Sequence, residues 1–179
     1  VKNGPAQVDM KKLTHLNGLY LAELPADDFI RGARARLAGQ DWAAAADDAH
    51  FRRVCAMMQS RTKLYTHVMD WKYFFSEDFS FDEKAVQKEL KKPGSGAALA
   101  ALIGRLESSD FSAPAVEQAL RQSEKDAGLA EGKVNQPARV AVTGVAAGAG
   151  IYETLALLGR ETGLRRLKKA VDGICGAQP

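Results

Sequence analysis

Residues 97–107 read Ala-Ala-Leu-Ala-Ala-Leu-Ile-Gly-Arg-Leu-Glu, and the spacing of their large apolar residues predicts a helix with one buried face. Leu99, Leu102, Ile103 and Leu106 recur at intervals of three and four residues, which is the period of an α-helix. The first half of the chain carries a second stripe with this period: Phe51, Val54, Cys55 and Met58. No segment alternates apolar and polar residues for long enough to indicate a strand. The sequence therefore predicts an all-α protein.

Caps and breakers divide the rest of the chain into further expected helices. Asp9 is a good N-cap for a helix that Pro25 ends, and Ser112 is a good N-cap for a helix that reaches Ala127. The other helices are expected over residues 27–38, from 41 through the second stripe, over 64–71, 82–91, 133–143 and 151–158, and from 162 onwards.

The composition changes near residues 80–82, where we place a boundary. We expect two small helical subdomains of the helix-bundle or cage type in tandem, residues 1–82 and 83–179. The aromatic residues Trp71, Phe74 and Phe75 precede this boundary and are expected near the junction. Residues 1–5 read as a linker.

The composition is that of a globular protein, with a net charge of +3 that does not by itself establish nucleic-acid binding. The two cysteines, Cys55 and Cys175, cannot form a disulfide framework, so we expect a reducing environment. No stretch is long and apolar enough to span a membrane. These features together predict a cytoplasmic protein.

The sequence also lacks a recognisable catalytic centre. Its three histidines are not spaced as metal ligands, and no serine or cysteine lies in a nucleophile motif. The glycine-rich residues 144–150 have neither a preceding strand nor the Lys-Ser/Thr pair of a phosphate-binding loop. We therefore interpret them as a turn between helices.

Two segments carry a resemblance to a known family. Residues 136–144 read Gln-Pro-Ala-Arg-Val-Ala-Val-Thr-Gly, and after a short loop residues 150–161 read Gly-Ile-Tyr-Glu-Thr-Leu-Ala-Leu-Leu-Gly-Arg-Glu, followed by Leu-Arg-Arg-Leu at 164–167. This pattern closely resembles the C-terminal signature of bacterial glutamyl-tRNA synthetases. Residues 8–20, with Asn17-Gly18 and Tyr20, are similar to the segment where that family passes from its catalytic half to its helical anticodon-binding half. His15 stands where the family usually has tryptophan.

The resemblance implies the anticodon-binding region of a glutamate–tRNA ligase, a class I aminoacyl-tRNA synthetase of protein biosynthesis. The nucleotide-binding signatures of class I synthetases are missing here, so this chain is expected to be inactive alone and to hold no cofactor. The parent enzyme would use ATP and Mg²⁺. The implied partners of this monomeric chain are tRNA(Glu) and its own upstream catalytic domain. Two alternatives stay open: the same module from a non-discriminating glutamyl-tRNA synthetase, and a helical protein–protein scaffold.

The same resemblance assigns site residues. Arg61 matches the family arginine that reads the third anticodon base, and Arg139 matches a second arginine at the anticodon. Gly148, Ala149 and Ile151 match loop positions that approach the bases with backbone groups and an apolar surface. Basic residues on outward helix faces are candidates for phosphate contacts: Arg52, Arg53, Lys63, Arg165, Arg166 and Lys168.

Overall fold

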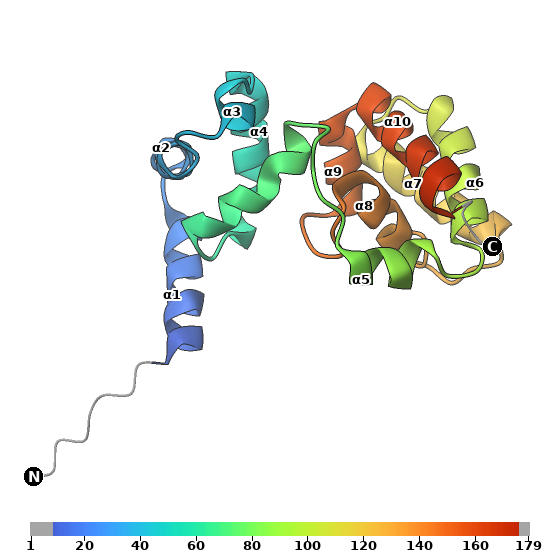
Figure 1. The fold of residues 1–179 in the computed structure, drawn as a ribbon, viewed down its shortest axis with the longest axis horizontal. Helices are drawn as coiled ribbons and strands as arrows, with labels where there is room; N and C mark the ends of the chain where they lie inside the picture. Colours follow the sequence, from blue (N-terminus) through green and yellow to red (C-terminus); the bar gives the residue numbers. More distant parts are fainter. Residues whose placement is uncertain (1–8, 176–179) are drawn as a thin grey trace, which may run out of the picture. The chain divides into compact units, whose positions relative to one another are not determined.

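The computed structural model describes residues 9–175, and every regular element in that range is helical (Figure 1). The all-α prediction is confirmed. The chain divides into two compact units, Val1–Phe75 and Ser76–Pro179. The linker expected at residues 1–5 lies outside the described residues. Within residues 9–175, no helix combines the length and apolar character that crossing a membrane requires.

The first unit is built around a cluster of aromatic side chains. Its elements are α1 (Met10–Glu23), α2 (Ala26–Arg36), α3 (Asp41–Ala44), α4 (Asp48–Met58), the 3₁₀ turn η1 (Gln59–Arg61) and the 3₁₀ helix η2 (Tyr65–Phe74). Phe29 of α2 is fully buried, with its ring centroid 5.6 Å from that of Tyr65 and 6.3 Å from that of Trp71. Burial of such large rings supplies much of the hydrophobic stabilisation of a small unit.

The aromatic run at residues 71–75 packs against other rings of the same unit. The ring of Phe75 stacks on those of Trp42 and Phe51, with centroid separations of 5.7 and 5.6 Å. The backbone oxygen of Phe74 is 2.9 Å from His50 Nε2. The contacts of Phe75 and Phe74 therefore fix the end of η2 to α4.

The prediction of one long helix from Asp41 is wrong, because the helix that begins there, α3, ends after four residues. The interruption has a local cause: Asp47 adopts a non-helical conformation, and its carboxylate accepts a hydrogen bond from the backbone N–H of His50 at 2.8 Å. A capped N-terminus satisfies a backbone donor that would otherwise lack a partner. A new helix, α4, therefore begins at Asp48.

The second unit has its own core, formed mainly by leucine, alanine and valine side chains. Its elements are α5 (Glu83–Ala85), the π-helical turn η3 (Val86–Leu90), α6 (Ser95–Glu107), α7 (Ala113–Asp126), α8 (Asn135–Thr143), α9 (Ile151–Leu158), α10 (Arg160–Ala170) and the π-helical turn η4 (Val171–Cys175). Helix α6 packs against α7 and α10, and α7 packs against α9. The apolar stripe at residues 99–106 is buried in this core, as expected.

Several helix ends agree with the predicted caps, among them Asp9 and Ser112, and others differ from the expected positions. The Ser112 hydroxyl accepts from the backbone N–H of Ala115 at 3.4 Å, and α9 ends before Gly159, as expected. Helix α6 begins at Ser95, two residues before the expected start, and the Ser95 hydroxyl donates to the backbone oxygen of Glu89 at 2.7 Å. The last helix begins at Arg160 rather than at residue 162.

Residues 76–82 belong to the second unit, so the division of the chain precedes the expected boundary. The backbone N–H of Asp82 donates to the backbone oxygen of Gly144 at 2.8 Å. Gly144 ends α8 with φ of 79°, and a Cβ at this position would lie 2.3 Å from the backbone oxygen of Ser80. Only glycine combines this backbone conformation with such a close approach. The Thr-Gly pair of the C-terminal signature is thus the place where α8 meets residues 79–82.

Candidate nucleic-acid interface

Arg61 lies on the surface of the first unit, at the last residue of the 3₁₀ turn that follows α4. Its Nη1 donates to the backbone oxygen of Met57 at 3.2 Å, and among the described residues it forms no ion pair. The next residue, Thr62, is only 2% exposed, and its hydroxyl donates to the backbone oxygen of Met58 at 2.8 Å. The backbone at Arg61 is therefore held in place, while most of its guanidinium donors face solvent.

A second cluster joins α8 to the loop before α9. Arg139 of α8 donates a hydrogen bond through Nη1 to the backbone oxygen of Ala149. The hydroxyl of Thr143 donates to the backbone oxygen of Arg139 at 2.8 Å and accepts from the backbone N–H of Val145 at 3.3 Å. The Gln-Pro-x-Arg and Thr-Gly parts of the signature thus shape one loop, residues 144–150.

The loop residues differ in what they can offer a ligand. Gly148 is exposed, whereas Ala149 and Ile151 are 1% and 2% exposed. The apolar surface expected from Ile151 is therefore turned into the core of the second unit. Contacts from Ala149 and Ile151 with a base would have to come from backbone groups.

Sequence reasoning missed a network of polar side chains that joins α7 to α8 and α9. Arg121 donates to the Tyr152 hydroxyl and to Asn135 Oδ1, the latter at 3.2 Å, and pairs with Glu124. Glu124 is buried and accepts from the backbone N–H of Val134 at 3.0 Å. Although burial opposes the charged guanidinium, its hydrogen bonds to Tyr152 and Glu124 raise the pKa of Arg121 overall. The only signal in the sequence is the i,i+3 spacing of Arg121 and Glu124.

Four of the six candidates for phosphate contacts are already paired with carboxylates: three exposed cations and the buried Arg166. Arg52 pairs with Asp27 at 2.7 Å and with Asp48 at 2.9 Å. Arg165 pairs with Glu77 at 3.0 Å, and Lys168 pairs with Glu107 at 2.6 Å. To reach a phosphate, each of these cations would have to leave a carboxylate.

Arg53 and Lys63, by contrast, are exposed and form no ion pair with any residue in the described range 9–175. The two cations lie in the first unit, Arg53 on α4 and Lys63 in the turn that follows Arg61. They can approach a phosphate without breaking an intramolecular ion pair.

The expectation that Arg166 faces outward is wrong. Arg166 is 4% exposed and donates to Glu77 Oε1 at 2.7 Å and to the backbone oxygens of Val142 and Ser76 at 2.7 and 3.1 Å. Its guanidinium carbon lies 4.5 Å from the centroid of the Phe79 ring. Helix α10 begins two residues earlier than expected, and residues 76–79 cover the face that carries Arg166. This arginine binds the start of the second unit to α8 and α10.

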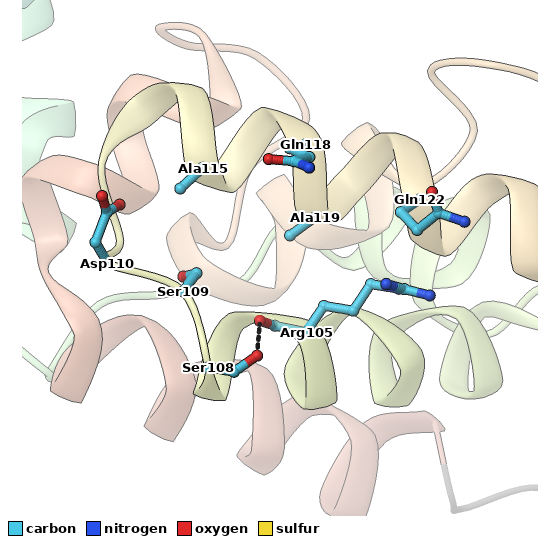
Figure 2. Close-up of a pocket in the computed structure, with 8 residues that line it drawn as sticks. All are labelled: Arg105, Ser108, Ser109, Asp110, Ala115, Gln118, Ala119 and Gln122. Atoms are coloured by element: carbon cyan, nitrogen blue, oxygen red, sulfur yellow. Dashed lines mark hydrogen bonds between the residues drawn. The ribbon is translucent and has the colours of Figure 1, made fainter.

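A polar cavity of about 510 Å³ lies between α6 and α7 (Figure 2). The hydroxyls of Ser108 and Ser109 donate to the backbone oxygens of Arg105 and Leu106, each at 3.1 Å. Arg105 is paired with Asp126. The carboxylate of Asp110, which also lines the cavity, accepts from the backbone N–H of Ser112 at 2.9 Å. Both serine hydroxyls donate to the main chain instead of to this carboxylate, so these side chains do not form a nucleophilic site.

Comparison with known proteins agrees with the resemblance in the C-terminal signature. Residues 28–171 match the model of the anticodon binding domain. The glutamate–tRNA ligase of Mycolicibacterium smegmatis is 35% identical over 182 residues, which cover 97% of this chain and 36% of that protein. The glutamate–tRNA ligase of Moorella thermoacetica is also 35% identical, over 97% of this chain and 37% of its own length. The chain thus spans little more than a third of these relatives.

A solved structure agrees with the fold. The glutamate tRNA ligase from Elizabethkingia meningosepticum aligns with a TM-score of 0.79 at 24% identity, over 97% of this chain and 34% of that one. At this identity the likeness concerns the fold alone. The match to the anticodon binding domain shows the family as well, because it covers well over half of the chain. The protein belongs to the anticodon binding domain family.

Proposed function

We propose that this chain is the anticodon-binding part of a glutamate–tRNA ligase and that it recognises the anticodon of tRNA(Glu). The observation that carries the proposal is the family match over residues 28–171, which includes both Arg61 and Arg139. The relatives from M. smegmatis and M. thermoacetica, both named glutamate–tRNA ligase, support the choice of amino acid.

In this proposal Arg61 reads the third anticodon base. Glutamate anticodons have cytosine there, whereas glutamine anticodons have guanine. The pairing edge of cytosine offers acceptors to a guanidinium, which carries five donors and no acceptor. Guanine presents two donors on the same edge, and these would face the arginine without partners. Good base contacts in DNA discriminate by about 1–3 kcal/mol, and we expect a similar magnitude here.

Arg139 and the loop at 144–150 act on the other anticodon bases. The hydrogen bond from Arg139 to the Ala149 oxygen holds the loop against α8 and supports a fixed loop conformation. Gly148 is exposed and has no side chain, so a base can approach its backbone closely. Arg53 and Lys63, which have no carboxylate partners within the described part of the chain, contact phosphates.

ATP-dependent charging with glutamate belongs to an upstream catalytic domain that supplies the ATP and Mg²⁺ sites. Helix α1 supports contact with such a domain, because several large apolar side chains are exposed along it: Met10, Leu13, Leu16, Leu19 and Tyr20. An exposed apolar face of this kind is typical of a protein–protein contact. The chain is expected to be a monomer in the cytoplasm once this face is covered.

Salt dependence of tRNA binding distinguishes this function from a helical protein scaffold. Each neutralised phosphate of a single strand contributes about −0.7 to the slope of log K against log salt concentration. Two phosphate contacts, by Arg53 and Lys63, predict a slope of about −1.4. A chain that binds no tRNA at any salt concentration would be a scaffold. A chain that binds cytosine- and guanine-bearing anticodons equally would belong to a non-discriminating synthetase.

A further inference from the structure

The turn that carries Arg61 is fastened to helix α1 on both sides of the arginine. On the N-terminal side, Gln59 Nε2 donates to the backbone oxygens of Leu21 and Leu24, at 2.9 and 2.8 Å. These carbonyl groups lie at the C-terminal end of α1, where the helix itself provides no donors. The two bonds use both N–H donors of the Gln59 amide. This amide therefore has a structural use and no donor left for RNA.

On the C-terminal side, Lys63 is held by two adjacent residues of α1. Asn17 Nδ2 donates to the backbone oxygen of Lys63 at 2.5 Å. A Cβ at Gly18 would lie 3.0 Å from Lys63 Cγ and 3.4 Å from Lys63 Cα, so the absence of a side chain lets the two backbones approach. The Asn-Gly pair thus forms a docking point for the end of the turn.

Arg61 lies between these two attachments. The only residue between Arg61 and Lys63 is the buried Thr62, whose hydroxyl bond to Met58 fixes the turn to α4 as well. The backbone that carries the guanidinium is thus tied to two helices, while the Arg61 side chain extends into solvent. Recognition of a base edge depends on a donor position that is set before the base arrives.

We infer that Asn17 and Gln59 are positioning residues for Arg61 and that they determine specificity at the third anticodon base without touching RNA. This inference rests on the proposed role of Arg61. If the attachments are lost, the turn samples other conformations, and the guanidinium then loses its favourable contact with cytosine and no longer distinguishes it from guanine. Affinity for the rest of the anticodon loop should change less than the preference, since Arg53 and the loop at 144–150 do not depend on these attachments.

The test measures dissociation constants of the 179-residue chain for two anticodon stem-loop RNAs that differ only in the third anticodon base, cytosine or guanine. Gln59→Met keeps the side-chain length and removes both donors. We expect it to lower the cytosine-over-guanine ratio at least about threefold while changing affinity for the guanine RNA less than about twofold. Gln59→Lys restores donation to the same two oxygens and should recover the ratio. Gln122→Met is the matched control, because Gln122 donates one comparable hydrogen bond, to Asp126 at 2.9 Å, in the second unit.

Arg61→Gln separates failure of this inference from failure of the proposed function. If Arg61→Gln abolishes the preference but Gln59→Met leaves it intact, the positioning role is refuted. If Arg61→Gln itself leaves the preference unchanged, the role of Arg61 is wrong, and the positioning role is refuted with it. If Gln59→Met fails to fold by circular dichroism, Asn17→Ala, which removes a single hydrogen bond, decides by the same ratio. An equal loss of affinity for both RNAs would indicate a purely structural role and would also refute the inference.

Discussion

Replacement of the buried Arg166 should destabilise the second unit far more than replacement of an exposed basic residue on the same helix. Arg166→Met keeps much of the side-chain volume but removes every donor. The backbone oxygens of Val142 and Ser76 then lose a charged donor, and Glu77 loses its closest partner. Methionine also cannot reproduce the guanidinium contact with the Phe79 ring.

The structure allows the magnitude to be estimated. Hydrogen bonds to charged groups contribute about 1.5–3 kcal/mol each, but bonds made by one side chain are not additive. Glu77 is half-exposed and keeps Arg165 as a partner, so its charge is not left buried. The loss of a charged donor by two backbone oxygens dominates, and we expect about 3 kcal/mol for Arg166→Met, the upper end of the range for one such bond. It would be a large part of the total stability of a unit this size, which is about 5–15 kcal/mol.

Urea denaturation followed by far-ultraviolet circular dichroism measures this effect. Lys168→Met is the matched control, because Lys168 lies on the same helix and pairs with Glu107 on the surface. Exposed pairs contribute about 0–1 kcal/mol, so the control should unfold almost as the unchanged chain does. If Arg166→Met cost no more than the control, the buried guanidinium described here would be incorrect.

Three further predictions concern thiol reactivity, acid stability and catalysis. Burial raises the pKa of the Cys55 thiol to about 12. Cys55 should therefore react with iodoacetamide at neutral pH more slowly than the partly exposed Cys175. Equal reaction rates in the folded chain would contradict the burial of Cys55. Burial opposes ionisation of Glu77, but hydrogen bonds from Arg166 and Arg165 outweigh it and lower the pKa of this carboxyl below its ordinary value of 4.5. The stability that the ionised Glu77 contributes is therefore complete above pH 4.5 and is lost as pH falls through the lowered pKa. Glu77→Gln should make the free energy of unfolding depend less on pH in this acid range. An unchanged acid denaturation curve would contradict the role of Glu77. The chain alone should show no glutamate-dependent ATP–pyrophosphate exchange, and adenylate formation by a clean preparation would refute its inactivity.

Local patterns predicted most of the helices because their causes are local. The 3.6-residue period at 97–107 and the cap at Ser112 act within one helix, and the structure confirms them. The break after Ala44 was missed, although Asp47 is itself a good cap, because the apolar stripe that follows suggested one continuous helix. Competition between a cap and a continuing helix depends on tertiary packing.

The candidate site was less predictable, since it depends on pairs far apart in the sequence. Arg165 and Arg166 are adjacent and chemically identical, yet one is exposed and the other is buried against Glu77. A helical period predicts only that they point in different directions. Which of them faces the core depends on where residues 76–79 lie, and no periodic pattern encodes that position. The attachment of Gln59 to the end of α1 was missed for the same reason.

The central claim, that Arg61 reads the third anticodon base, is tested most directly by equilibrium binding of Arg61→Gln to the two stem-loop RNAs. The unchanged chain should prefer cytosine over guanine by about 5- to 150-fold, which corresponds to about 1–3 kcal/mol. Glutamine adds a carbonyl acceptor that guanine can use, so the preference should collapse, whereas overall affinity should fall only slightly because one charge is lost. A cytosine preference that survives Arg61→Gln would contradict this account of the site.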